Sequence, residues 1–186
     1  MSGVSRETQR LITREDCVLL VIDVQEKLVP VVSNKERVIE NVIRLSRFAQ
    51  IIGMPVIFTE QVKLGLTLPE VRKELSNVQT VSKIYFNCFF CKEFSDGIEK
   101  TGRKTLIVAG IEAHICVAQT ALYALPDFNV HVISDAVSSR TPENCHVALE
   151  RMVRAGVVIS STEMFIYELL QRAGTDEFKT VLQLVK

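Results

Sequence analysis

Short, almost continuously apolar segments alternate along this chain with longer segments of helical spacing. The apolar segments span residues 18–24, 55–59, 104–109, 129–134 and 157–160. Between the first two, apolar residues recur at helical spacing, at Val38, Val42, Leu45 and Phe48. Strands without a polar face are typical of a parallel sheet covered on both sides. The alternation therefore predicts an α/β fold: a three-layer, doubly wound sheet of five to six mainly parallel strands with helices on both faces.

The domain organisation is predicted to be simple. No composition shift, internal repeat or Ser/Gly linker divides the chain, so we expect residues 1–186 to form a single domain. The rhythm breaks over residues 64–91, where glycine, proline and a polar run predict a loop or lid. Two helices are expected near the C-terminus, over residues 163–170 and 177–184.

Composition excludes several classes of partner. Lys plus Arg and Asp plus Glu number 22 each, so no net field favours nucleic acid or an anionic membrane surface. The apolar stretches are far shorter than the roughly 20 residues needed to cross a bilayer. Residues 1–14 lack the apolar core of a secretory signal. We expect a cytoplasmic protein with a small-molecule substrate, while import into an organelle stays open.

The cysteines favour a reducing compartment and no cofactor. Their number is odd, and they are scattered through the chain, at Cys17, Cys88, Cys91, Cys116 and Cys145. The CxxC pair has no second ligand pair at zinc-site spacing, so we expect no metal. The stretch that follows the first strand, residues 23–27, contains no glycine, which argues against a nucleotide cofactor.

Candidate site residues follow the predicted strands, because ligands of open parallel sheets bind at the carboxyl ends of the strands. Cys116 comes just before an apolar helical run, and a helix N-terminus favours thiolate. The alternative is a buried cysteine that only packs. Asp23 ends the wholly apolar run of residues 18–22 and is either a general base or a solvated strand end. Lys83 either holds the charge of that acid or is an ordinary surface lysine.

Other polar residues near these strand ends have weaker signals. Glu60 and Gln61 either line a pocket or cap a loop. Asp135 and the stretch 138–140 either brace the site or form a subunit contact. His114 lies two residues before Cys116, and side chains at that spacing on a helix point apart, so a Cys–His dyad is rejected. His131 is expected at the surface or the edge of the core.

Three stretches taken together resemble one known family. They are Leu-Leu-Val-Ile-Asp23-Val-Gln25, Lys83 with Phe86 close behind, and Ala-Gly110-Ile-Glu-Ala-His-Ile-Cys116. This arrangement resembles the isochorismatase-like hydrolase superfamily of cysteine hydrolases, which includes nicotinamidases and N-carbamoylsarcosine amidohydrolases. It is most similar to the isochorismatase-domain-containing proteins, over nearly the whole chain.

The resemblance implies a set of site residues. The family triad falls on Asp23, Lys83 and Cys116. A cis peptide is implied between Ile111 and Glu112, with the backbone amides of Glu112 and Cys116 as the oxyanion hole. We expect the substrate pocket to include Gln25, Gln61 and Phe86. The family also implies a homo-oligomer, with the apolar C-terminal segments as a candidate contact.

The departures from the family pattern narrow the function. Where nicotinamidases carry metal-binding histidine, this chain reads Thr59-Glu60-Gln61, which argues against a metal and against nicotinamide as substrate. The presence of Cys116 argues against isochorismate, whose cleavage in this family does not depend on cysteine. The expected function is a metal-independent cysteine hydrolase that acts on a small amide or related carbonyl or imine substrate through a Cys-acyl intermediate. The alternative is a binding or scaffold protein on the same fold.

Overall fold

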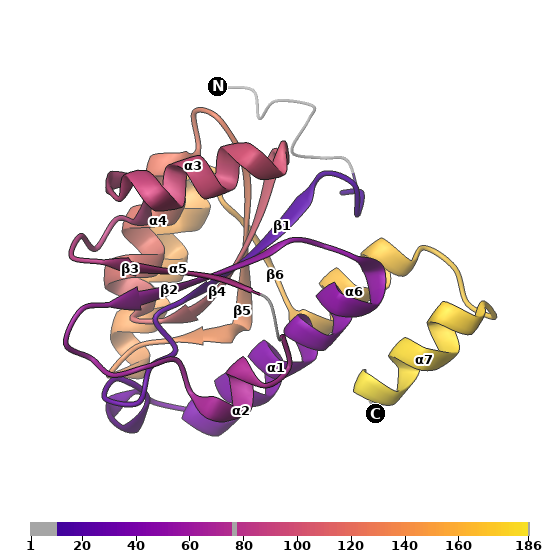
Figure 1. Cartoon of the computed structure of the whole chain (residues 1–186), viewed down its shortest axis with the longest axis horizontal. Coiled ribbons are helices and arrows are strands. Elements are labelled where there is room, and N and C mark those ends of the chain that lie inside the picture. Colours follow the sequence, from indigo (N-terminus) through magenta and orange to yellow (C-terminus); the bar gives the residue numbers. More distant parts are fainter. Residues whose placement is uncertain (1–10, 76–77, 186) are drawn as a thin grey trace.

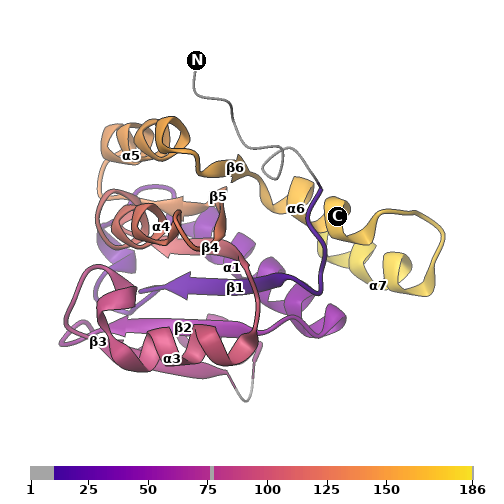
Figure 2. The ribbon, with the colours of Figure 1, turned by 90° about the horizontal axis from the view of Figure 1, so that it is seen from above.

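A six-stranded parallel sheet forms the centre of the structure, a computed structural model that describes residues 11–75 and 78–185 (Figure 1). The strands are β1 (Cys17–Ile22), β2 (Val56–Gln61), β3 (Gln79–Lys83), β4 (Thr105–Ile111), β5 (Asn129–Ser138) and β6 (Val158–Ser160). Their order in the sheet is β3-β2-β1-β4-β5-β6, and Figure 2 shows β3 and β6 at its opposite edges. The predicted doubly wound α/β fold is confirmed.

Helices cover both faces of this sheet (Figure 1). One face carries α1 (Lys35–Ile52), α6 (Thr162–Leu170) and α7 (Asp176–Val185), and the other carries α3 (Lys92–Thr101), α4 (Ala118–Ala124) and α5 (Pro142–Ala155). The remaining helical segments are short: η2 (Val29–Val31), α2 (Pro69–Arg72), η3 (Cys88–Phe90) and η4 (Ala113–Val117). The two helices expected near the C-terminus are α6 and α7.

Burial on both faces explains why β1 reads as a continuous apolar run. All six of its side chains are buried. Leu19 and Val21 pack toward α1, whereas Leu20 and Ile22 pack toward α3 and α4, as the two-residue repeat of a strand requires. Each face of the sheet therefore has its own hydrophobic core.

The winding reverses between β1 and β4. From β1 the chain moves outward to β2 and β3, then returns to β4 on the other side of β1. Ligand sites of doubly wound sheets lie at the carboxyl ends of the strands flanking such a reversal. Asp23 and the Gly110–Cys116 stretch follow the two central strands at that edge.

The prediction of a loop or lid over residues 64–91 is wrong in part, because it contains the strand β3. This edge strand pairs only with β2, and of its residues only Val81 and Lys83 are buried. One-sided burial allows polar residues at the other positions, so the strand has no continuous apolar run. The polar stretch thus delivers Lys83 to the sheet edge.

The position expected for Asp135, after a strand ending at residue 134, is also corrected. Strand β5 continues to Ser138, with a shift in its pairing with β4 between Val108 and Gly110. The Asp135 carboxylate accepts hydrogen bonds from the backbone N–H and the hydroxyl of Thr162, both at 2.8 Å. Asp135 therefore braces the first turn of α6.

The membrane expectation can be checked only on the described residues. Within 11–75 and 78–185, no helix is long and apolar enough to cross a bilayer. Most of the N-terminal segment considered for a targeting signal, residues 1–10, lies outside the described residues.

Candidate active site

Asp23 is held rigidly at the carboxyl end of β1. Its side chain is fully buried, and its backbone has a left-handed φ of 55°, a conformation that aspartate tolerates better than most residues. The backbone N–H donates to the Thr59 carbonyl at 3.2 Å, and the Thr59 hydroxyl donates to Oδ1 at 2.8 Å. Thr59 was not singled out from the sequence, and its place in β2 beside β1 is the only signal for this role.

Lys83 brings the predicted triad together. Its ammonium Nζ lies 2.7 Å from Asp23 Oδ2 and 3.7 Å from Cys116 Sγ, and the Lys83 and Asp23 side chains are both fully shielded from solvent. A further hydrogen bond runs from Nζ to Gln61 Oε1, at 2.9 Å. Burial by itself lowers the pKa of Lys83, but the negative charges around it, Asp23 foremost, outweigh burial and raise that pKa. Lys83 is therefore a protonated cation at neutral pH.

Cys116 is the fourth residue of the π turn η4, which directly precedes α4. π turns inside helices occur frequently at functional sites. The Glu112 carbonyl accepts from the N–H groups of Ile115 and Val117, and within the described residues it accepts none from Cys116. The Cys116 N–H is therefore not used in the hydrogen bonds that hold this turn to the Glu112 carbonyl.

The expectation of a low thiol pKa at Cys116 is wrong for the resting site. The Cys116 side chain is buried, and burial raises its pKa, with a further increase from the charge of Asp23 that Lys83 only partly offsets. Burial also raises the pKa of Cys17 to about 12 and that of Cys88 to about 11. The Cys116 thiol is therefore protonated at rest, and a base is needed to generate thiolate.

The predicted cis peptide between Ile111 and Glu112 is also wrong. No peptide bond of the described residues is cis. The chain turns instead through positive φ angles at Gly110 (133°) and Glu112 (59°). A Cβ on Gly110 would lie 2.1 Å from the Ile22 carbonyl oxygen, so only glycine allows β4 to approach the end of β1 this closely.

The Glu112 side chain anchors the same turn from behind. It is 3% exposed, and its Oε1 accepts a hydrogen bond from Arg140 Nε at 2.6 Å. Its Oε2 lies 3.4 Å from His114 Nδ1, which is itself 3.0 Å from Ser139 Oγ. Arg140 and Ser139 thus brace the turn, one of the two roles considered for them, and the His114 ring contacts these groups in place of a dyad with Cys116.

Gln25, Gln61 and Phe86, the residues expected to line a substrate pocket, differ in burial and in hydrogen bonding. Gln25 is fully buried: its Nε2 donates to the carbonyls of Gln61 and Gly65 and its Oε1 accepts from the Gln61 N–H. Its amide therefore ties together the chain segments after β1 and β2. The Gln61 side chain bridges Lys83 and the Ile84 carbonyl. Phe86 is 52% exposed.

Glu60 shows the loop-capping role that was one of its two expected roles. Its Oε1 accepts from both the backbone N–H and the hydroxyl of Thr67, at 2.7 Å and 2.8 Å. Across the described ranges, no group of three or more His, Cys, Asp or Glu side chains could hold a metal ion. The five cysteines, all within those ranges, are free thiols.

Fold and site together define a class of protein: a doubly wound α/β protein with a buried Asp–Lys–Cys cluster at the carboxyl edge of its parallel sheet. The Isochorismatase domain model matches residues 17–164. The chain belongs to the isochorismatase family, and this membership supports a hydrolase of the isochorismatase-like superfamily.

Curated relatives match the chain over its whole length. The secreted isochorismatase effector Isc1 of Phytophthora sojae is 35% identical, over 100% of this chain and 93% of the relative. The isochorismatase domain-containing protein 2 of Danio rerio is 32% identical, over 100% of this chain and 92% of the relative.

Solved structures share the fold closely. A structure described as the MAR1 ribonuclease of Caenorhabditis elegans has a TM-score of 0.88 at 34% identity, over 95% of this chain and 92% of that one. YcaC of Pseudomonas aeruginosa, solved with hexane-2,5-diol and covalent acrylamide, has a TM-score of 0.88 at 25% identity, over 94% and 91%. YcaC of Escherichia coli, described as an octameric hydrolase of unknown specificity, has a TM-score of 0.87 at 25% identity, over 93% and 89%.

Proposed function

We propose that this protein is a metal-independent cysteine hydrolase that cleaves the C–N bond of a small amide through a thioester on Cys116. One observation carries the proposal: the Lys83 ammonium contacts both the Asp23 carboxylate, at 2.7 Å, and the Cys116 sulfur, at 3.7 Å, inside a buried cluster. A lysine used only for solubility would keep its ammonium in water, because burying a charge without function is costly.

In the first step Asp23 takes the proton of the Cys116 thiol while the sulfur attacks the amide carbon. The raised pKa of this thiol, caused mainly by burial, makes such a base necessary. The contacts of Asp23 and Cys116 with the same ammonium support a short path for the proton. Lys83 keeps its positive charge and offsets the negative charge that moves from carboxylate to sulfur.

The attack converts the carbonyl oxygen into an oxyanion, for which the Glu112 and Cys116 backbone N–H groups are the proposed donors. Support comes from the π turn, whose bonds to the Glu112 carbonyl omit the Cys116 N–H. Donors of this kind each contribute roughly 3–4 kcal/mol to transition-state stabilisation. The Glu112–Arg140 ion pair fixes the turn that presents them.

Collapse of the tetrahedral intermediate breaks the C–N bond. The proton held by Asp23 passes to the departing nitrogen, which leaves as ammonia or an amine, and the acyl group stays on sulfur as a thioester. Asp23 then deprotonates a water molecule that attacks the thioester. The carboxylic acid product leaves, and the Cys116 thiol regains its proton.

Independence from metal is supported by the residues at the end of β2. The Glu60 carboxylate is engaged by Thr67, and Gln61 is engaged by Lys83 and the Ile84 carbonyl. YcaC of Pseudomonas aeruginosa was solved with covalent acrylamide, whose electrophilic carbon is its alkene carbon, and this adduct supports a reactive nucleophile in a relative of this fold. We therefore take small uncharged amides as the first substrates to test.

The test is ammonia release from a panel of small primary amides and N-carbamoyl compounds, combined with intact-protein mass spectrometry of the acyl adduct. We expect at least one amide to be hydrolysed, with the adduct on Cys116. Cys116→Ala should abolish the adduct, and Asp23→Asn should slow turnover by ~10²–10⁴-fold. Cys145→Ala, at a half-buried thiol on α5, is the matched control and should behave as wild type.

Two other outcomes would contradict the proposal. If no amide gives ammonia or an adduct, the scaffold alternative takes its place. If RNA is cleaved in a Cys116-dependent manner while amides are not, the activity instead follows that of the structure described as a ribonuclease. The formal net charge of the chain is zero, which favours small amides over RNA as substrates.

A further inference from the structure

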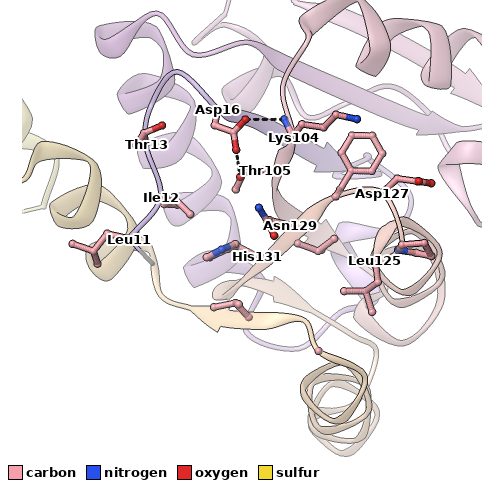
Figure 3. Close-up of a pocket in the computed structure, with 15 residues that line it drawn as sticks. Leu11, Ile12, Thr13, Asp16, Lys104, Thr105, Leu125, Asp127, Asn129 and His131 are labelled. Carbon is pink, nitrogen blue, oxygen red and sulfur yellow. Dashed lines mark hydrogen bonds between the residues drawn. The ribbon is translucent and has the colours of Figure 1, made fainter. Parts of the chain in front are cut away.

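A cavity of about 570 Å³ lies where the strands begin, whereas Cys116 follows the carboxyl end of β4. Figure 3 shows the residues that line this cavity. The cavity is lined where β4, β5 and β6 begin and by the segment that enters β1. Its volume falls within the range typical of small-molecule sites, roughly 300–1,000 Å³. The proposed hydrolase mechanism uses none of its residues.

The charged side chains at this cavity either form hydrogen bonds within the protein or point away from the cavity. Both oxygens of Asp16 accept hydrogen bonds, from the Lys104 N–H at 3.2 Å and the Thr105 hydroxyl at 2.6 Å. The Lys104 ammonium lies 5.1 Å from the centre of the Phe128 ring. In Figure 3 the Lys104 and Asp127 side chains extend away from the middle of the cavity. The cavity therefore offers a ligand no free charge at its centre.

Two neutral side chains occupy that centre instead, Asn129 and His131 (Figure 3). They lie two residues apart on β5, so both point to the same face of the sheet. His131 is only 8% exposed, and within the described residues neither side chain has a hydrogen-bond partner. The polar atoms of these two side chains are not among the buried unpartnered atoms of the described residues, so they remain accessible from the cavity.

The protonation state of His131 defines what it can bind. Burial lowers its pKa, although the charge of Glu168 opposes this shift. A neutral imidazole carries one N–H donor and one acceptor nitrogen, and the Asn129 amide likewise carries donors and an acceptor. Leu11, Ile12 and Leu125 supply apolar walls around them.

We propose that this cavity binds a small uncharged molecule whose edge presents an adjacent hydrogen-bond donor and acceptor, as a cyclic amide does, to Asn129 and His131. The side chains two apart on a strand are separated by ~7 Å along its axis, so a single small ring can contact both. An anionic ligand would find no unengaged cation at the centre, and a metal ion would find too few ligands.

The chain provides its own reporters, because it contains three histidines. NMR spectra of the imidazole ring protons during titration with 2-piperidone, a six-membered cyclic amide, monitor all three sites together. His131 reports on the cavity, His114 on the turn beside Cys116, and His146 on the surface of α5. We expect a saturable shift of the His131 signals only.

Three matched comparisons decide the outcome. N-methyl-2-piperidone has the same ring without the donor, and it should bind several-fold to ~tenfold more weakly, as should 2-piperidone to Asn129→Ala. Asp127→Asn, at a side chain that points away, should bind as wild type does. The inference is overturned if His131 does not shift up to the solubility limit of 2-piperidone, if the N-methyl compound binds equally well, or if only His114 responds.

Discussion

At the scale of single residues, the main feature is an ion pair that water does not reach. Lys83 and Asp23 have fully shielded side chains; the Thr59 hydroxyl donates a further hydrogen bond to Asp23, and Gln61 Oε1 accepts one from Lys83. A buried pair of this kind adds little net stability, because desolvation cancels much of the attraction. Its retention here is consistent with the proposed role in activating Cys116.

Removing one partner of this pair should be much more damaging than removing both. We expect Lys83→Met to lower the free energy of unfolding by about 3 kcal/mol, since it leaves the Asp23 carboxylate buried without its counter-charge. The double variant Asp23→Asn/Lys83→Met should recover at least about 1 kcal/mol of that loss. Urea unfolding at neutral pH measures both values.

The control for this double-mutant experiment is Lys92→Met on the surface of α3. Lys92 forms an exposed pair with Asp96, so its removal should change the unfolding midpoint very little. An equal effect of Lys83→Met and Lys92→Met would show that the buried pair has no special energetic status.

His131 should make the stability of the protein depend on pH. Its pKa is lowered in the folded state by burial, so below the unfolded-state pKa of about 6.5 the unfolded chain binds a proton that the folded chain does not. Stability is therefore complete above about pH 6.5 and falls as the pH decreases. Between about pH 7.5 and 5.5 we expect wild type to lose more stability than His131→Gln. Parallel losses in both proteins, measured by urea unfolding, would contradict this assignment.

At the scale of elements, the close approach of β4 to β1 sets the position of the site. Gly110 lies beside Ile22, and the turn that follows it leads directly into η4 and Cys116. The contact between Ile22 and Gly110 therefore sets the distance between Asp23, which follows β1, and Cys116, which follows β4. Any side chain at position 110 would push these two elements apart.

Gly110→Ala should be strongly destabilising. The new Cβ would lie 2.1 Å from the backbone oxygen of Ile22, at a φ of 133° that side-chain-bearing residues avoid. We expect a loss of more than about 3 kcal/mol, or failure to accumulate soluble protein. Gly156→Ala is the matched control: it also has a positive φ but meets no atom within 4 Å, so it should lose only about 1–2 kcal/mol. Thermal unfolding compares the two, and equal losses would show that the Ile22 contact is unimportant.

At the scale of the whole molecule, a subunit contact through the C-terminal helices stays a prediction, although most of the apolar residues of these helices face inward. Their main apolar side chains, including Phe165, Leu169 and Val181, are buried against this chain's own core. A different apolar surface is exposed between the end of β3 and α4. It consists of Tyr85, Phe90 and Tyr123, which we call the aromatic surface.

We expect the protein to assemble as a homo-oligomer through the aromatic surface. Large exposed apolar surfaces mark interaction sites, and the three aromatic side chains of this surface contact one another in a continuous row. Light scattering coupled to size-exclusion chromatography should give a mass well above the 20.9 kDa of one chain. The double variant Phe90→Glu/Tyr123→Glu should reduce that mass, whereas Met164→Glu, at an exposed residue of α6, should not. A monomeric wild type would refute the prediction.

The sequence by itself determined the layers of the fold. Strands buried on both faces must be continuously apolar, and β1 and β4 show this directly. Because parallel strands present their carboxyl ends at one edge, the sequence also predicted the region of Asp23 and Cys116. Lys83 was predicted as a site residue only because the chain resembles a known family, since one lysine in a polar stretch has no distinctive local signal.

Only the tertiary structure decided how these residues behave. The edge strand β3 has just one strand neighbour, so its sequence carries no continuous apolar pattern. The direction of the Cys116 pKa shift depends on burial and on the distances to Asp23 and Lys83, which no local motif specifies. The ion pair of Glu112 with Arg140 joins residues 28 positions apart. Energies that arise from desolvation and from contacts distant in sequence exist only once the chain has folded.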